Sequence, residues 1–243
     1  MKKIIIANWK MQLSYRESIS LAKKFSQKID IKNNQVVVCP GYLPLKEVSD
    51  ILKKKNISVG AQDCAFYNEG AYTGEVSPES LKELKVKYVI IGHSERRKYL
   101  SEDSEAINEK IKVALKNNLI PILCIGEDLA IKKRGQAKKF LSQQLKKELK
   151  GVTLKNANGL IIAYEPIWAI GNGNSMMPSE ADTIHEYIKS YVHNVIGKRL
   201  KVIYGGSANS KNAEEFLKQK NVDGLLLGGA SLKVNEFNKI CQL

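Results

Sequence analysis

Short apolar runs alternate with longer amphipathic stretches along the whole chain. The runs are rich in β-branched residues and occupy residues 3–7, 35–39, 57–61, 88–92, 120–125, 160–164, 201–204 and 224–227. Each run is almost continuously apolar, without regular alternation of apolar and polar positions. This is the pattern of strands that are buried on both faces of a parallel sheet. The sequence therefore predicts eight parallel strands.

The stretches between these runs have the periodicity of helices. In residues 179–196 apolar side chains recur at three- and four-residue steps, at Ala181, Ile184, Ile188, Tyr191 and Val195. Ser77-Pro78 is typical of a helix start, with a capping serine and proline at the first helical position. Eight strand–helix units in series predict an α/β fold, a closed (β/α)8 barrel that forms a single domain over residues 1–243.

An open, doubly wound sheet has similar patterning and is the main alternative to the barrel. Such a sheet usually carries a GxGxxG turn after its first strand, where it binds a dinucleotide. This chain has Asn8-Trp9-Lys10-Met11 at that position, and no Pro- or Ser-rich linker divides it. The closed barrel is therefore favoured.

The chain is strongly basic, with 39 lysines and arginines against 25 acidic residues and a formal net charge of +14. Its lysines fall in short groups, such as 23–24, 53–55, 132–134 and 146–147, which are scattered over many predicted helices. Binding to a polyanion needs a concentrated patch or stripe, so solvated helix faces are favoured over a nucleic-acid footprint. The charge is compatible with a small anionic substrate.

The sequence predicts an intracellular, cytoplasmic protein without a metal or an organic cofactor. No apolar stretch reaches the roughly 20 residues of a membrane helix, and the first apolar run ends at Asn8, too early for a secretory signal. The four cysteines contain no CxxC pair, and with three histidines no zinc-ligand spacing occurs.

Polar residues that directly follow the predicted strands are the candidates for chemistry, because in a barrel the C-terminal strand ends meet at one mouth. They are Asn8 and Lys10 after the first strand, His93 and Glu95 after the fourth, Glu165 after the sixth, Gly205-Gly206-Ser207 after the seventh and Gly228-Gly229 after the eighth. For any one of them alone a structural role is the simpler interpretation, since single charged residues at strand ends are mostly solvated.

The two glycine pairs predict a phosphate site. Glycines let backbone N–H groups approach an anion closely, and a short helix that begins near Gly229 would point its positive end at the same place. Either pair alone could be a tight turn, but the loops after strands seven and eight are the usual phosphate site of these barrels. Lys10 would then be a cation inside the mouth of the barrel.

Glu165 and His93 predict proton abstraction next to a carbonyl group. A carboxylate can remove the carbon-bound proton, while an imidazole and an ammonium stabilise the resulting enediolate. Residues 95–97 read as the first turn of a helix, whose positive end disfavours a charged ring at His93. This chemistry needs no metal.

Five motifs resemble the triosephosphate isomerase family, and they occur in the family's order. They are AsnTrpLysMet at 8–11, GlyHisSerGluArgArg at 92–97, AlaTyrGluProIleTrpAlaIleGly at 163–171, TyrGlyGlySer at 204–207 and AspGlyLeuLeuLeuGlyGlyAlaSerLeu at 223–232. The resemblance covers nearly the whole chain. It implies a TIM barrel that interconverts dihydroxyacetone phosphate and D-glyceraldehyde 3-phosphate, two triose phosphates of glycolysis and gluconeogenesis.

The resemblance also implies a role for each candidate residue. Glu165 would be the general base, His93 the electrophile, Lys10 a cation held by Glu95, and Asn8 a hydrogen-bonding partner of the substrate. N–H groups of Gly171, Ser207, Gly228 and Gly229 would bind the phosphate. Residues 166–168 would be the first hinge of a lid, which Tyr204 and Ser207 latch.

Residues 62–76 resemble the family's long interdigitating loop. This implies a homodimer in which Thr73 reaches the partner's active site. Departures from the family pattern include Asn172 and Asn174 in the lid and Met176-Met177 at its second hinge, where Met cannot cap the following helix as Thr does. Two alternatives stay open: another phosphate-binding barrel enzyme, such as an aldolase, and a basic nucleic-acid-binding protein built on the barrel.

Overall fold

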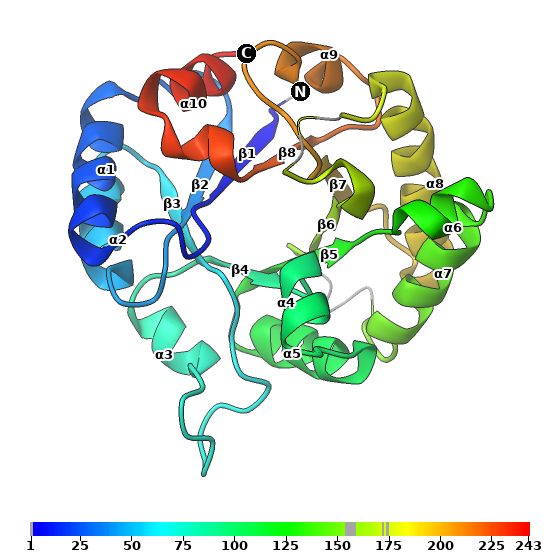
Figure 1. Cartoon of the computed structure of the whole chain (residues 1–243). Coiled ribbons are helices and arrows are strands. Elements are labelled where there is room, and N and C mark those ends of the chain that lie inside the picture. The colour runs from blue at the N-terminus through cyan, green and yellow to red at the C-terminus, as the bar shows by residue number, and fades with distance from the viewer. Residues whose placement is uncertain (1, 154–158, 172, 174) are drawn as a thin grey trace.

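The structure is a computed structural model that describes residues 2–153, 159–171, 173 and 175–243. The lid positions Asn172 and Asn174 therefore lie outside the described residues. Eight parallel strands close into a barrel in sequential order, with β1 paired to both β2 and β8 (Figure 1). The strands are β1 Ile4–Asn8, β2 Gln35–Cys39, β3 Ser58–Ala61, β4 Tyr88–Ile91, β5 Ile120–Ile125, β6 Ile161–Tyr164, β7 Lys201–Tyr204 and β8 Gly224–Leu227. The predicted (β/α)8 barrel is confirmed.

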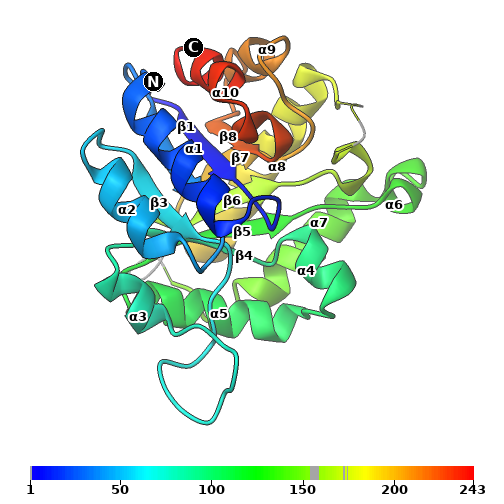
Figure 2. The ribbon, with the colours of Figure 1, turned by 60° about the vertical axis from the view of Figure 1, so that its left-hand side comes forward.

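The helices form an outer ring around the strands (Figures 1 and 2). They are α1 Tyr15–Lys28, α2 Leu45–Lys53, α3 Pro78–Glu83, α4 Ser94–Tyr99, α5 Ser104–Lys116, α6 Leu129–Lys133, α7 Ala137–Glu148, α8 Pro178–Ile196, α9 Ala213–Leu217 and α10 Val234–Cys241, with 3-10 turns η1 Ile167–Ala169 and η2 Gly229–Leu232. The predicted cap of α3 is present, since the Ser77 side chain accepts from the N–H groups of Glu79 and Ser80. In the described part of the chain, no helix is long and apolar enough to span a membrane.

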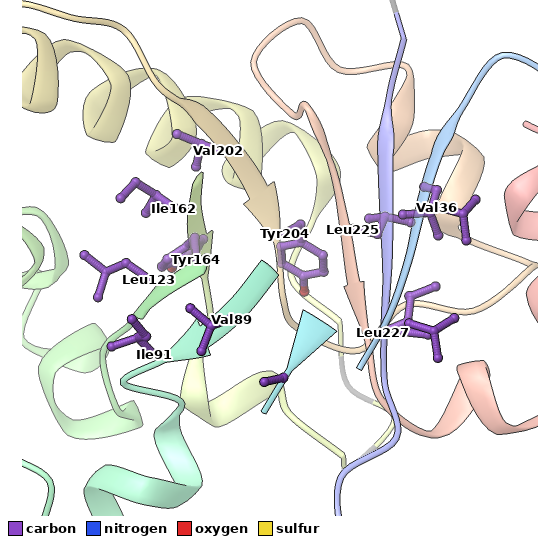
Figure 3. Close-up of a cluster of buried hydrophobic side chains, with 14 of the residues drawn as sticks. Val36, Val89, Ile91, Leu123, Ile162, Tyr164, Val202, Tyr204, Leu225 and Leu227 are labelled. Carbon is purple, nitrogen blue, oxygen red and sulfur yellow. The ribbon is translucent and has the colours of Figure 1, made fainter. Parts of the chain in front are cut away.

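Successive side chains of each strand point to opposite sides of the sheet, and in this barrel both sides are buried. One set, which includes Ile6, Ile122 and Ala163, fills the barrel. The other set packs outward against the helices and is drawn in Figure 3, where Tyr164 and Tyr204 are the large aromatic members. This double burial explains why the strands lack polar alternation.

The buried face of α8 differs from the predicted stripe at its C-terminal end. Val195 is 43% exposed, whereas Val192 and Ile196 are buried. From Ile188 onward the buried positions continue in steps of four, so they pass through Val192 and not through Val195. The prediction of Val195 as a core residue is therefore wrong. The same face also buries His185 completely, packed edge-on against Tyr164.

Burial of His185 predicts a loss of stability in mild acid. Desolvation lowers the pKa of His185 from 6.5 to about 3, and neither ring nitrogen has a hydrogen-bond partner within the described residues. Between these values the unfolded chain binds a proton that the folded chain does not, so stability falls as the pH falls below 6.5. We expect this ring to lower the free energy of unfolding by about 2 kcal/mol between pH 7 and pH 5. Urea unfolding at both pH values should show a smaller pH dependence for His185→Leu, and an unchanged dependence would contradict the assignment.

The start of α8 predicts a stabilising substitution. Met177 is the N-cap residue, is 68% exposed and makes no capping hydrogen bond. Met177→Thr supplies the missing acceptor to an N–H group of the first turn and should raise the free energy of unfolding by about 1 kcal/mol. Thermal unfolding of the unmodified protein, Met177→Thr and the control Met177→Ala would test this. Equal stabilisation by alanine would show that capping is not the cause.

Candidate active site

The sequence-predicted site residues meet in one pocket at the C-terminal ends of the strands. The pocket has a volume of ≈ 390 Å³, and its lining includes Asn8, Lys10, His93, Glu165, Gly171, Ser207, Gly228 and Gly229. Glu95 lies behind Lys10 and contacts it. Side chains two residues apart on a strand point to the same face. Ile6 and Ala163 point into the barrel, so Asn8 and Glu165, each two residues further on, point into its mouth.

The N-terminus of α4 holds both His93 and Glu165. The Nδ1 atom of His93 accepts a hydrogen bond from the backbone N–H of Glu95 at 3.2 Å. The single proton of a neutral ring is then on Nε2, which lies 3.2 Å from Oε1 of Glu165. The other carboxylate oxygen of Glu165 accepts from the backbone N–H of Ser94 at 3.1 Å. Both side chains are buried, so these hydrogen bonds act in a site from which water is largely excluded.

Lys10 is held by an ion pair and by an unusual backbone conformation. Its Nζ lies 2.5 Å from Oε1 of Glu95. Its φ of 52° is in the left-handed region, which costs a residue with a side chain about 1–3 kcal/mol. The Asn8 side chain accepts from the N–H of Lys10 at 3.0 Å, and the Gln62 side chain donates to its carbonyl at 2.8 Å. These two bonds fix the strained turn that directs the ammonium into the pocket.

Glycines give the end of β6 the space that it needs. A Cβ atom on Gly126 would lie 1.7 Å from the carbonyl oxygen of Glu165, and one on Gly205 would lie 2.8 Å from its Cγ. Gly205 was predicted only as part of the phosphate site, and Gly126 was not singled out at all. The signal available for Gly126 was its position directly after a strand.

Glu127, which was not predicted from the sequence, anchors the segment after β6 that the resemblance implies is the first hinge of a lid. This buried carboxylate accepts from the Tyr164 hydroxyl at 3.0 Å and from Nε1 of Trp168 at 2.9 Å. Burial raises the pKa of Glu127. On the other side of the indole ring, Nζ of Lys132 lies 3.3 Å from the ring centroid and 3.4 Å from Glu180. Glu127 follows a strand end by two residues, which could have identified it.

Ser207 and Tyr204, which the resemblance implies latch a lid, contact residues that follow β6, and Ser207 does so with two groups. Its hydroxyl and its backbone N–H both donate to the carbonyl of Ala169, at 2.7 and 2.8 Å. The Tyr204 hydroxyl accepts from the N–H of Met176 at 3.2 Å. The N–H predicted to bind phosphate is therefore already paired, and it becomes available to a ligand only after its bond to Ala169 breaks.

Glu236 extends the phosphate side of the pocket. Its carboxylate accepts from the N–H and the hydroxyl of Ser210, at 2.6 and 2.9 Å. This ties the start of α10 to the loop that carries Ser207. Gly228 and Gly229 lie beside this loop at the start of η2. Among the described residues that line the pocket, Glu165 and Glu236 are the two carboxylates.

The loop of residues 62–76 projects away from the barrel (Figures 1 and 2). Its base is held by a buried ion-pair cluster in which Asp63 contacts Lys110 at 2.7 Å and Arg96 at 2.9 Å. Phe66, Tyr67 and Tyr72 pack on one another and are partly exposed, and Thr73 near the tip is exposed.

Among the described residues, no group of three or more His, Cys, Asp or Glu side chains is arranged to hold a metal ion. The four cysteines are free and buried. The charged and polar side chains that line the pocket include the carboxylates of Glu165 and Glu236, the imidazole of His93 and the ammonium groups of Lys10 and Lys233. Together with the backbone N–H donors of the glycine pairs, they suit proton transfer on an anionic substrate.

Comparison with known proteins agrees with this geometry. The family model described as triosephosphate isomerase matches residues 3–243. The triosephosphate isomerase of Clostridium tetani is 42% identical, with 98% of this chain and 95% of the relative covered. That of Dictyoglomus thermophilum is 42% identical with 97% of each chain covered, and that of Dehalococcoides mccartyi strain CBDB1 is 43% identical with 100% and 96% covered. The chain belongs to the triosephosphate isomerase family.

Proposed function

We propose that the chain is an aldose–ketose isomerase that interconverts dihydroxyacetone phosphate and D-glyceraldehyde 3-phosphate. The observation that carries this proposal is the placement of Glu165, His93 and Lys10 in one small pocket beside the glycine pairs. Family membership supports the same activity. We also propose a cytoplasmic location, which the free, buried cysteines support because cytosolic thiols are kept reduced.

Glu165 is the general base in this proposal. It removes a proton from the carbon next to the substrate carbonyl and returns it to the neighbouring carbon, so that no net proton is consumed. For this, the carboxylate leaves the Ser94 N–H that it accepts from in the structure. His93 donates its Nε2 proton toward the carbonyl oxygen, and Lys10 stabilises the negative charge of the enediolate. Asn8 binds a substrate oxygen, and Glu95 positions Lys10.

The phosphate would be held by the N–H groups of Gly171, Ser207, Gly228 and Gly229. All four residues line the pocket. Binding frees the N–H of Ser207 from the Ala169 carbonyl, so it couples phosphate recognition to the first hinge of the lid. A closed lid excludes water, which protects a reactive enediolate from side reactions.

The two alternatives fit the structure less well. An aldolase that forms a Schiff base needs a lysine inside a barrel strand, but the only lysine within the described strands is Lys201, which is exposed at the start of β7. A nucleic-acid-binding protein that only reuses the barrel would have no need for Asn8, Lys10, His93 and Glu165 in one pocket.

A homodimer through residues 62–76 is part of the proposal. Exposed apolar side chains surround the base of this loop, including Met11 at 97% exposure and Leu43 at 88%. Gln62 donates to the Lys10 carbonyl and Tyr42 to the Asp63 carbonyl, so the loops that carry Met11 and Leu43 converge on this base. A second copy would cover this surface and place Thr73 beside the partner's pocket.

Removal of the base is the direct test of the activity. Glu165→Gln keeps the shape of the side chain but cannot take up a proton, and a general base contributes about 10²–10⁴-fold. We therefore expect kcat to fall by about a thousandfold in a dehydrogenase-coupled assay. The control Glu83→Gln changes an exposed carboxylate at the end of α3 and should keep full activity. No turnover by the unmodified protein would refute the proposed function, and an active Glu165→Gln would refute the role of the base.

The dimer is tested at Thr73. Thr73→Glu places an unpaired charge at the proposed interface, where burial without a partner is costly. We expect the unmodified protein to sediment at about twice the chain mass of 27.2 kDa and the variant to sediment near the chain mass, with reduced kcat. Asn33→Glu adds the same charge at an exposed position before β2, at the opposite end of the barrel, and should stay dimeric. A Thr73→Glu protein that remains a fully active dimer would contradict the proposed interface.

A further inference from the structure

The positive charge of the chain is concentrated on two consecutive helices, α6 and α7. Residues 129–150 contain eight cations and one carboxylate, a net +7 that is half of the chain's +14. The sequence alone favoured scattered lysines, because these cations fall in separate short groups. In the fold α6 and α7 lie next to each other on one side of the barrel, so the segments that carry these groups are adjacent (Figures 1 and 2).

This face has no exposed carboxylate of its own. Its single acidic residue, Glu148, is fully buried and pairs with Arg97. The preceding carboxylate, Asp128, caps α6 through the N–H of Ile131. Seven of the eight cations are exposed and make no ion pair within the described residues: Lys133, Arg134, Lys138, Lys139, Lys146, Lys147 and Lys150. By contrast, Lys46 on α2 and Lys112 on α5 pair with carboxylates of their own helices.

The cations of α7 are ordered in space. Lys139 and Lys146 are seven residues apart and therefore lie on the same side of α7, and Lys150 follows two residues after the helix ends. Lys146, Lys147 and Lys150 also border a surface groove of ≈ 760 Å³, with Phe140 and Gln143 in its lining. Like charges at these spacings repel one another in the free protein. A bound polyanion would remove this repulsion.

We propose that this basic face, defined as the exposed cations of residues 133–150, binds the phosphate backbone of a nucleic-acid duplex. Lysine is depleted at protein–protein interfaces, whereas it is a common partner of nucleic-acid phosphates, and six of the seven exposed cations are lysines. A membrane surface fits less well, because among the described residues 129–150 Leu129 is the one large apolar side chain that is exposed, at 48%. The binding is independent of base sequence, since its contacts are charges directed at phosphates.

The test measures binding of labelled 20-base-pair DNA and RNA duplexes by fluorescence anisotropy from 50 to 200 mM salt. We expect the full chain to bind, with affinity that falls steeply as salt rises. The triple variant Lys139→Glu/Lys146→Glu/Lys150→Glu should lose at least about tenfold in affinity at 50 mM salt. The slope of log K against log salt should become shallower by about 2–3, since each lost phosphate contact removes about 0.9.

A matched triple variant separates the face from net charge. Lys23→Glu/Lys28→Glu/Lys53→Glu makes the same charge change at exposed positions of α1 and α2 and should bind within about threefold of the unmodified protein. Both variants should keep isomerase activity, which shows that they are folded. Equal losses in the two variants, or no binding at 50 mM salt, would overturn the proposal. Tighter binding to phosphatidylserine vesicles or to polyglutamate than to either duplex would also overturn it, in favour of a membrane or an acidic protein.

Discussion

The two-residue alternation of side chains along the barrel strands is the constraint on which the site depends. Ile6 and Ala163 point into the barrel core, and Asn8 and Glu165 therefore enter the mouth from the same side of their strands. A shift of one residue in register would turn the base outward, against the helices. Such a shift is very costly in a closed, buried sheet. It would turn the side chains that fill the barrel toward the helices, and the side chains that pack against the helices into the barrel. The stability of the core and the position of the base thus have one cause.

The N-terminus of α4 is the second organising element, because it joins the catalytic groups to each other. Its first N–H groups bind Glu165 and Nδ1 of His93, and its Glu95 side chain binds Lys10. Arg97 then anchors the helix, with bonds to the carbonyl of Gly92 and to the buried carboxylate of Glu148. A helix of six residues has little stability in isolation. Here its position is set by buried ionic contacts instead of by its own length.

Most of the fold and the membership of the pocket could be predicted from the sequence. Strands β2, β5, β7 and β8 have the predicted bounds, since runs buried on both faces have a strong apolar signal. Contacts that depend on tertiary geometry could not be predicted. Gly126 is required because the carbonyl oxygen of Glu165, directly after β6, lies 1.7 Å from where its Cβ would be. Glu127 follows a strand end, but the two donors that converge on it are visible only in the structure. The cations of the basic face are concentrated in one contiguous stretch, residues 129–150, and their exposure and lack of ion pairs within the described residues are visible only in the structure.

The pairing of Ser207 with Ala169 shows how the pocket can discriminate between empty and occupied states. In the structure the Ser207 N–H donates to a neutral carbonyl, a bond that contributes about 0.5–1.5 kcal/mol, whereas a bond to a charged acceptor contributes about 1.5–3 kcal/mol. A phosphate dianion therefore competes favourably for this N–H, and the exchange leaves the Ala169 carbonyl at the end of η1 with its bond from the Ser207 hydroxyl. An uncharged triose offers no such gain and leaves the bond in place. In the proposed function, the charge of the substrate is thus sensed by the backbone N–H that bonds to the proposed lid hinge, which links recognition of phosphate to movement of the lid without any additional residue.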